Sequence, residues 1–169
     1  VSILSLEKYS NILAAVVDSP YTSIVSLMTQ LARSKKIPKW LIKRSIKKIR
    51  KRIQKKAQFD IHEVSPISKV ENIEKPIFFI HGTDDLFVVP DNSQQLFDSC
   101  PSQFKEIHLV PGEHDSDRPQ DILKLATTFL CRSIGMSITF SDDSAPNETP
   151  PNQASLQHYR NVQDMIDSM

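Results

Sequence analysis

The chain has 169 residues, which suits one ordinary domain and is short for two. Its 21 Lys and Arg nearly balance its 20 Asp and Glu, but residues 33–56 hold 13 of the basic residues and no acidic one. No apolar run approaches the roughly 18 residues that a membrane-spanning helix needs. Two cysteines that fall on separate predicted helices argue against a disulfide framework, so we expect a reducing, cytoplasmic location.

The first residues predict a helix followed by a buried strand. Residues 1–9 have a helical pattern with no capping residue ahead of it. Ile12–Val17 is a continuous apolar run, typical of a strand buried on both faces of a parallel sheet, and Asp18-Ser19-Pro20 ends it. Because the helix begins in mid-pattern and this strand needs a second neighbour, we expect the chain to be one segment of a larger protein.

A helical insertion follows the first strand. Residues 21–33 predict one helix, and Pro38 opens a second, strongly basic helix that runs to about Ala57. The apolar residues of the second helix recur at helical spacing and form one stripe: Ile42, Ile46, Ile49 and Ile53. We expect this stripe to pack onto the rest of the fold, with residues 22–57 forming a separate helical unit.

Strands and helices alternate in the remainder. The predicted elements are a strand at Ile77–Ile80, a helix at Asp91–Ser99, a strand at Phe104–Val110 near a sheet edge, and a helix capped by Ser116 or Asp117. This order predicts an α/β fold with a doubly wound, mostly parallel sheet built from residues 1–21 and 58–135. Residues 136–169 are polar and Pro-rich, so we expect a disordered tail.

Acidic and histidine residues follow the predicted strands. Asp18, the Asp84-Asp85 pair and His114 each come just after a strand, where reactive groups of such sheets lie. A carboxylate that accepts the imidazole Nδ1–H fixes the tautomer of the histidine and stabilises its protonated form. That pair is the orienting half of a nucleophilic triad. The third member is not found, because no G-x-S-x-G motif occurs in the 169 residues.

Three stretches together resemble the α/β-hydrolase superfamily, and within it the serine-aminopeptidase and prolyl-oligopeptidase-like branch. They are A-A-V-V-D-S-P-Y at 14–21, I-F-F-I-H-G-T-D-D-L-F-V-V-P at 77–90 and G-E-H-D-S-D-R-P at 112–119. The resemblance covers about residues 1–133 and implies the C-terminal part of that fold. It implies Asp85 as catalytic acid and His114 as base, with Asp84 and Asp18 as alternatives for the acid. It also implies a serine nucleophile a few residues before Val1.

The resemblance implies cleavage of an ester, thioester or amide bond through an acyl-enzyme, in a complete protein that includes the other half of the fold. The helices at 22–57 would then form a cap over the site, with Met28 and Trp40 as candidate pocket residues. The chain as given lacks the nucleophile and is expected to be inactive alone. His81, Asp85 and His114 do not have a recognised metal-ligand spacing, so neither metal nor cofactor is expected.

The basic helix supports a competing interpretation, a non-catalytic module that binds an anionic membrane or an acidic partner such as a calmodulin-like protein. Each Lys or Arg near an anionic surface contributes about 1 kcal/mol, and Trp40 would lie at the interface. The basic residues that would make these contacts are Lys43, Arg44, Lys47, Lys48, Arg50, Lys51 and Arg52. Nucleic acid is not expected, because no aromatic stacking set or binding motif accompanies the charge.

Overall fold

The computed structural model describes residues 2–137, so the predicted tail from residue 138 onward lies outside the described residues. The elements in chain order are α1 (Ser2–Lys8), β1 (Ala15–Asp18), α2 (Ile24–Ser34), α3 (Lys39–Ala57), α4 (Ile67–Val70), β2 (Ile77–Gly82), α5 (Asp91–Ser99), β3 (Lys105–Val110) and α6 (Gln120–Ser133). No helix among these is long and apolar enough to cross a membrane.

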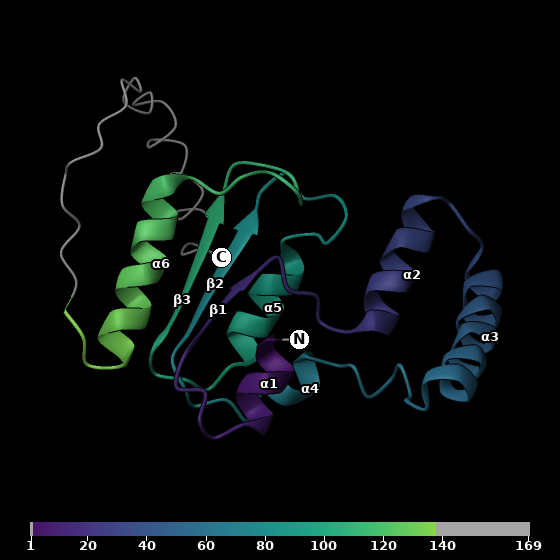
Figure 1. Ribbon diagram of the computed structural model, residues 1–169. Helices are drawn as coiled ribbons and strands as arrows, with labels where there is room; N and C mark the ends of the chain where they lie inside the picture. The colour runs from purple at the N-terminus through teal and green to yellow at the C-terminus, as the bar shows by residue number, and fades with distance from the viewer. Residues whose placement is uncertain (1, 138–169) are drawn as a thin grey trace. The chain divides into compact units, whose positions relative to one another are not determined.

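The three strands form one parallel sheet in the order β1-β2-β3. Its register pairs Ala15 with Ile77 at one end and Gly82 with Val110 at the other. Figure 1 shows α6 on one side of the sheet and α1 and α5 on the other, so helices cover both faces. The predicted doubly wound parallel α/β arrangement is confirmed.

Alternate residues of β2 divide the core into two clusters. Ile77 and Phe79 pack with α1, α4 and α5, whereas Phe78 and Ile80 pack with α6. All six residues of β2 are buried. Because every side chain of this strand lies in a core, β2 is a fixed platform for the loop that follows Gly82.

The first strand is shorter than the apolar run predicts, since β1 begins at Ala15 and not at Ile12. The backbone N–H of Ile12 donates instead to the carbonyl of Tyr9, and pairing with β2 starts where Ala15 N–H donates to Pro76 O. Pro76 has no N–H, and β2 begins only at Ile77, so this strand offers no earlier partner to residues 12–14. The partner strand, not the apolar run, sets the start of β1.

The helices α2 and α3 pack against each other as a hairpin. Ser23 caps α2, because its hydroxyl accepts a hydrogen bond from Ser26 N–H. The predicted bounds of α3 are confirmed within one residue, and its apolar stripe faces α2, with Ile42 buried and the other three isoleucines half-buried. The stripe therefore packs mainly on the neighbouring helix.

Candidate functional site

The loops after β2 and β3 are joined by backbone hydrogen bonds that continue the sheet register. Thr83 N–H donates to Val110 O at 2.8 Å, and Asp84 N–H donates to Gly112 O at 3.1 Å. Gly82 permits this approach, because a Cβ there would lie 2.3 Å from the carbonyl oxygen of Gly112. The two loops are thus held side by side at the carboxyl ends of their strands.

Asp85 and His114 meet where these two loops join. His114 Nδ1 lies 2.7 Å from Asp85 Oδ2. The other carboxylate oxygen of Asp85 accepts hydrogen bonds from Phe87 N–H at 2.9 Å and Val88 N–H at 2.8 Å. The side chain of Asp85 is fully buried, whereas that of His114 is 33% exposed. A buried, fully bonded carboxylate therefore holds an imidazole that reaches the surface.

The electrostatics of Asp85 favour its ionised form. Burial alone would raise the pKa of the Asp85 carboxyl, but the hydrogen bonds from His114 and from Val88 N–H outweigh burial and lower it. An ionised carboxylate only accepts hydrogen bonds, so Nδ1 of His114 carries the proton. In neutral His114 the Nε2 atom then has a free lone pair, which is the state of a general base.

The exposed side of His114 is bordered by an aromatic ring. The rings of Phe87 and His114 lie 5.0 Å apart between centroids, at 53° to each other. Nε2 of His114 has no hydrogen-bond partner among residues 2–137. Phe87 is itself 48% exposed, so an aromatic ring borders the exposed side of the imidazole.

Asp84 and Asp18, the two alternatives predicted for the acid, have partners other than His114. Asp84 is exposed, and its carboxylate accepts from Gly112 N–H at 3.2 Å. Asp18 forms a bidentate pair with Arg118, with Arg118 Nε 2.9 Å from one Asp18 oxygen and Arg118 Nη2 2.9 Å from the other. Neither carboxylate contacts His114, so the described contacts favour Asp85 over both alternatives.

Arg118 is a site residue that sequence reasoning missed. Its side chain is only 6% exposed, and besides Asp18 it donates to Glu113 O at 3.2 Å and to Ser19 Oγ at 3.1 Å. One guanidinium therefore joins the end of β1 to the loop that carries His114. A signal was present, because Arg118 is the only Lys or Arg between Lys105 and Lys124 in an acidic stretch.

The start of α6 corrects a further prediction. Neither Ser116 nor Asp117 caps this helix, which begins at Gln120 with Pro119 as its N-cap. Ser116 instead stabilises the His114 loop, because its hydroxyl accepts from Glu113 N–H at 2.8 Å. The polar residues before α6 thus shape the loop and not the helix.

His81 is a structural histidine beneath the site. It is fully buried, with Nε2 2.6 Å from Val88 O and Nδ1 2.6 Å from Ser93 Oγ. Burial lowers the pKa of His81, against the opposing effects of Val88 O and Asp85. Nε2–H therefore donates to the carbonyl, and Nδ1 accepts from the Ser93 hydroxyl, which fixes the turn that presents Asp85.

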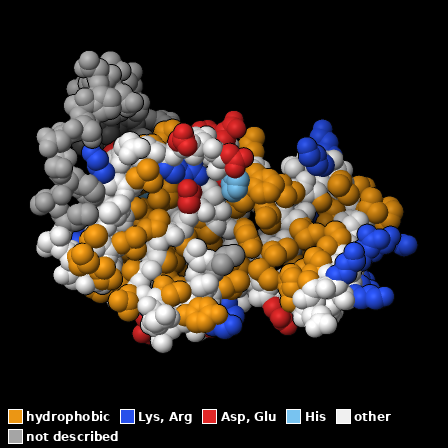
Figure 2. Space-filling view, viewed as in Figure 1, with side chains coloured by type: hydrophobic (Ala, Val, Ile, Leu, Met, Phe, Trp, Pro, Cys, Tyr) orange, Lys and Arg blue, Asp and Glu red, His pale blue; other side chains and the backbone are white. Residues whose placement is uncertain are grey.

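The candidate pocket and lipid-binding residues all lie on the α2–α3 hairpin. Met28 lines a cavity of about 300 Å³ between the two helices, whereas Trp40 is 68% exposed and does not line it. Figure 2 shows Lys and Arg side chains gathered over α3. Of the basic residues on α3, Arg50 alone has a salt bridge within the described part of the chain, to Asp60. The same part contains no cluster of His, Cys, Asp and Glu placed to hold a metal.

Solved structures with the same fold include three archaeal enzymes. An esterase of Pyrococcus furiosus matches 77% of this chain and 47% of its own length, with a TM-score of 0.54 and 20% identity. A monoacylglycerol lipase of Paleococcus ferrophilus matches 78% and 63%, with a TM-score of 0.50 and 18% identity. An acylaminoacyl peptidase of Pyrococcus horikoshii matches 83% and 23%, with a TM-score of 0.55 and 15% identity. Residues 2–137 thus form part of an α/β-hydrolase fold.

A similarity in amino-acid sequence is also found. Over 72 residues the chain is 33% identical to the monoglyceride lipase of Saccharomyces cerevisiae, a match that covers 43% of this chain and 23% of the lipase. No protein-family model matches the chain. The chain spans about a quarter of the yeast lipase and about half of the P. furiosus esterase.

Proposed function

We propose that this chain supplies the acid and the base of a serine hydrolase that cleaves an ester, thioester or amide bond. The observation that carries the proposal is the 2.7 Å contact between Asp85 Oδ2 and His114 Nδ1, on a histidine side chain that is 33% exposed. The named relatives, an esterase, two lipases and a peptidase, support the same chemistry. The nucleophile is expected outside these 169 residues, because they contain no G-x-S-x-G motif.

In the proposed mechanism His114 moves the proton. Its Nε2 accepts the hydroxyl proton of the serine as the serine oxygen attacks the carbonyl carbon of the substrate. Ionised Asp85 stabilises the imidazolium that forms, and the imidazolium then returns the proton to the leaving group. Water repeats the same steps on the acyl-enzyme. Arg118 would keep the His114 loop in place during both half-reactions.

The acid–base assignment is tested by two matched substitutions in the protein that includes the sequence preceding Val1. Asp85→Asn should lower kcat by about four orders of magnitude, because an amide in place of the carboxylate favours the wrong tautomer of His114. Asp84→Asn removes the adjacent, exposed carboxylate and should change kcat less than about threefold. Equal effects of the two substitutions would contradict the assignment.

The position of the nucleophile is tested by covalent labelling. A serine-directed fluorophosphonate should label the longer protein in a manner that depends on His114 and should leave the 169-residue chain unlabelled. Stoichiometric labelling of a serine within the 169 residues would contradict this part of the proposal while leaving the acid and base intact.

A second candidate function is favoured by the charge of α3. The helix has ten basic and no acidic residues, and Trp40 and Leu41 are exposed near its first turn. We propose that this face binds an anionic bilayer, which would place the protein at a membrane surface in the cytoplasm. Co-sedimentation with anionic vesicles but not with neutral ones would support it. Equal binding to both, or none, would contradict it.

A further inference from the structure

A second cavity lies on the α2–α3 hairpin, and none of its lining residues belongs to the acid–base pair. It has a volume of about 460 Å³, within the range of small-molecule pockets. Its apolar lining comes from both helices, with Val25 on α2 and Ile42 and Ile46 on α3. Thr29 adds no free donor, because its hydroxyl donates to Val25 O at 2.7 Å within α2. The floor of this cavity is therefore suited to hydrocarbon.

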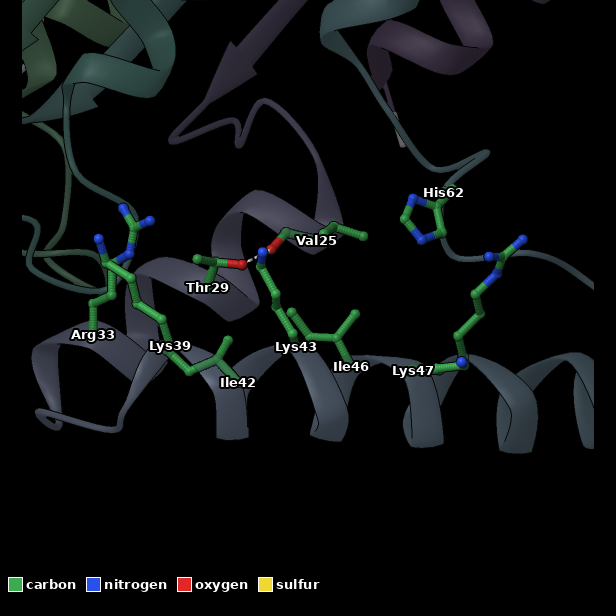
Figure 3. Close-up of a pocket in the computed structure, with 10 residues that line it drawn as sticks. Val25, Thr29, Arg33, Lys39, Ile42, Lys43, Ile46, Lys47 and His62 are labelled. Atoms are coloured by element: carbon green, nitrogen blue, oxygen red, sulfur yellow. Dashed lines mark hydrogen bonds between the residues drawn. The ribbon is translucent and has the colours of Figure 1, made fainter.

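The rim of the same cavity is cationic. It is formed by Arg33 of α2 and by Lys39, Lys43, Lys47 and Arg50 of α3, together with His62 from the loop after α3. No acidic residue of the described part of the chain lines it. Figure 3 shows Arg33 and Lys39 at one end of the cavity and Lys43 rising from α3 towards α2.

Most of the charges on this rim have no salt bridge within residues 2–137. Arg50 is neutralised by a bidentate pair with Asp60, but Arg33, Lys39, Lys43 and Lys47 have no salt bridge there. Three of these lysines follow one another at intervals of four residues, so they are neighbours on one helix face and repel each other. A bound anion would relieve this repulsion.

We propose that this cavity binds a single-chain anionic amphiphile, a hydrocarbon chain that ends in a carboxylate or phosphate. The chain would lie along Val25, Ile42 and Ile46, and the anionic head would contact the lysines of the rim. Each methylene buried from water strengthens binding by about fourfold, and charge-assisted hydrogen bonds fix the head. The proposal does not depend on the hydrolase function, because neither Asp85 nor His114 takes part in it.

The lining also separates this site from a general attraction of α3 to membranes. Lys48 and Lys51 lie on the same helix and carry the same charge, but they do not line the cavity. A bilayer would be attracted by every exposed basic residue of α3, whereas a molecule in the cavity would contact only the basic residues of the rim. Paired substitutions on and off the rim therefore distinguish the two kinds of binding.

The test uses the 169-residue chain and probes of matched length below their micelle concentrations. Isothermal titration, with the fluorescence of the single tryptophan, Trp40, as a second readout, should show saturable 1:1 binding of dodecanoate and of dodecyl phosphate. Dodecyl phosphate should bind at least about tenfold more tightly than inorganic phosphate. Equal binding of dodecyltrimethylammonium, which has the same chain and the opposite charge, would overturn the proposal.

Two double variants complete the test. Lys43→Gln with Lys47→Gln should weaken binding of dodecyl phosphate by about tenfold or more, whereas Lys48→Gln with Lys51→Gln, which removes the same charge, should change it less than about threefold. Val25→Trp, which fills the floor and leaves every charge in place, should also abolish binding. Circular dichroism checks that each variant keeps its helices. Equal weakening by the two lysine pairs would overturn the proposal.

Discussion

Two arginine–aspartate pairs have the same chemistry in different regions of the molecule. Arg118 and Asp18 meet at the strand ends, where the arginine side chain is 6% exposed and its guanidinium also donates to a carbonyl and a hydroxyl. Arg50 and Asp60 meet at the α2–α3 hairpin, where the arginine side chain is 44% exposed and makes no other hydrogen bond within the described residues. Both pairs are bidentate, and the aspartates differ in the opposite sense, with the Asp18 side chain 45% and the Asp60 side chain 14% exposed. The difference between the two pairs is therefore the burial of the arginine.

The comparison separates two ways in which charge is used in this chain. At the strand ends Asp85 pairs with His114 and Asp18 pairs with Arg118, and each pair holds a loop in position. On the hairpin most charges have no partner among residues 2–137. A paired charge on a buried side chain holds a loop in position, whereas an unpaired charge on an exposed side chain is available to bind a ligand or a surface.

The largest effect on stability is expected at Gly82. Gly82→Ala would place a Cβ 2.3 Å from the backbone oxygen of Gly112, and a backbone atom cannot move aside without opening the two loops. We expect a loss of about 3 kcal/mol in the free energy of unfolding, measured by urea titration. Gly135→Ala is the matched control. Its Cβ meets nothing within 4 Å, and only the positive φ of 74° costs about 1 kcal/mol.

The next effect tests the buried guanidinium. Arg118→Ala should lower the free energy of unfolding by about 2 kcal/mol, because it removes a buried hydrogen-bonding group that joins β1 to the His114 loop. In a double-mutant cycle with Asp18→Asn, we expect a measurable coupling free energy between residues 18 and 118. A vanishing coupling would show that the pair adds nothing beyond its packing.

A smaller effect concerns pH. Burial lowers the pKa of His81, so the unfolded chain takes up a proton below its ordinary pKa of about 6.5 while the folded chain does not. The stability that neutral His81 contributes is complete above that pH and declines as the pH falls towards the lowered pKa. His81→Gln should flatten this decline in urea titrations between pH 7.5 and 5.

The smallest effect is expected for the pair with the exposed arginine, Arg50 with Asp60. Arg50→Ala should leave the urea midpoint nearly unchanged, because solvent screens this pair and the arginine side chain is mobile when free. If Arg50→Ala destabilises the chain as much as Arg118→Ala, burial does not explain the contrast between the two regions.

Much of the fold was predictable because its elements carry strong local patterns. The apolar run at Ile77–Ile80, the isoleucine stripe of α3 and the residues 91–99 gave the elements that the structure contains. The predicted start of β1 was wrong, because the true start depends on Pro76, just before the neighbouring strand, and no local pattern around residue 12 reveals this. The predicted caps of α6 were wrong, because the Ser116 hydroxyl accepts a hydrogen bond from Glu113 N–H within the preceding loop.

The candidate site was predictable only in part. The positions of Asp85 and His114 after successive strands predicted their proximity, since parallel strands bring their carboxyl ends to one edge. The role of Arg118 was not predicted, because it rests on contacts to residues about 100 positions away. The sequence likewise does not reveal which lysines of α3 line a cavity, since that depends on how closely α2 packs.

The guanidinium of Arg118 has a consequence for motion. It is bonded at once to the turn after β1 and to the segment before His114, and its Nη1 also lies close to Gly82 at the end of β2. Because one guanidinium bonds both of these segments, neither can open without breaking contacts of the other. Their amides should therefore exchange with deuterium at a common rate, as a single cooperative unit.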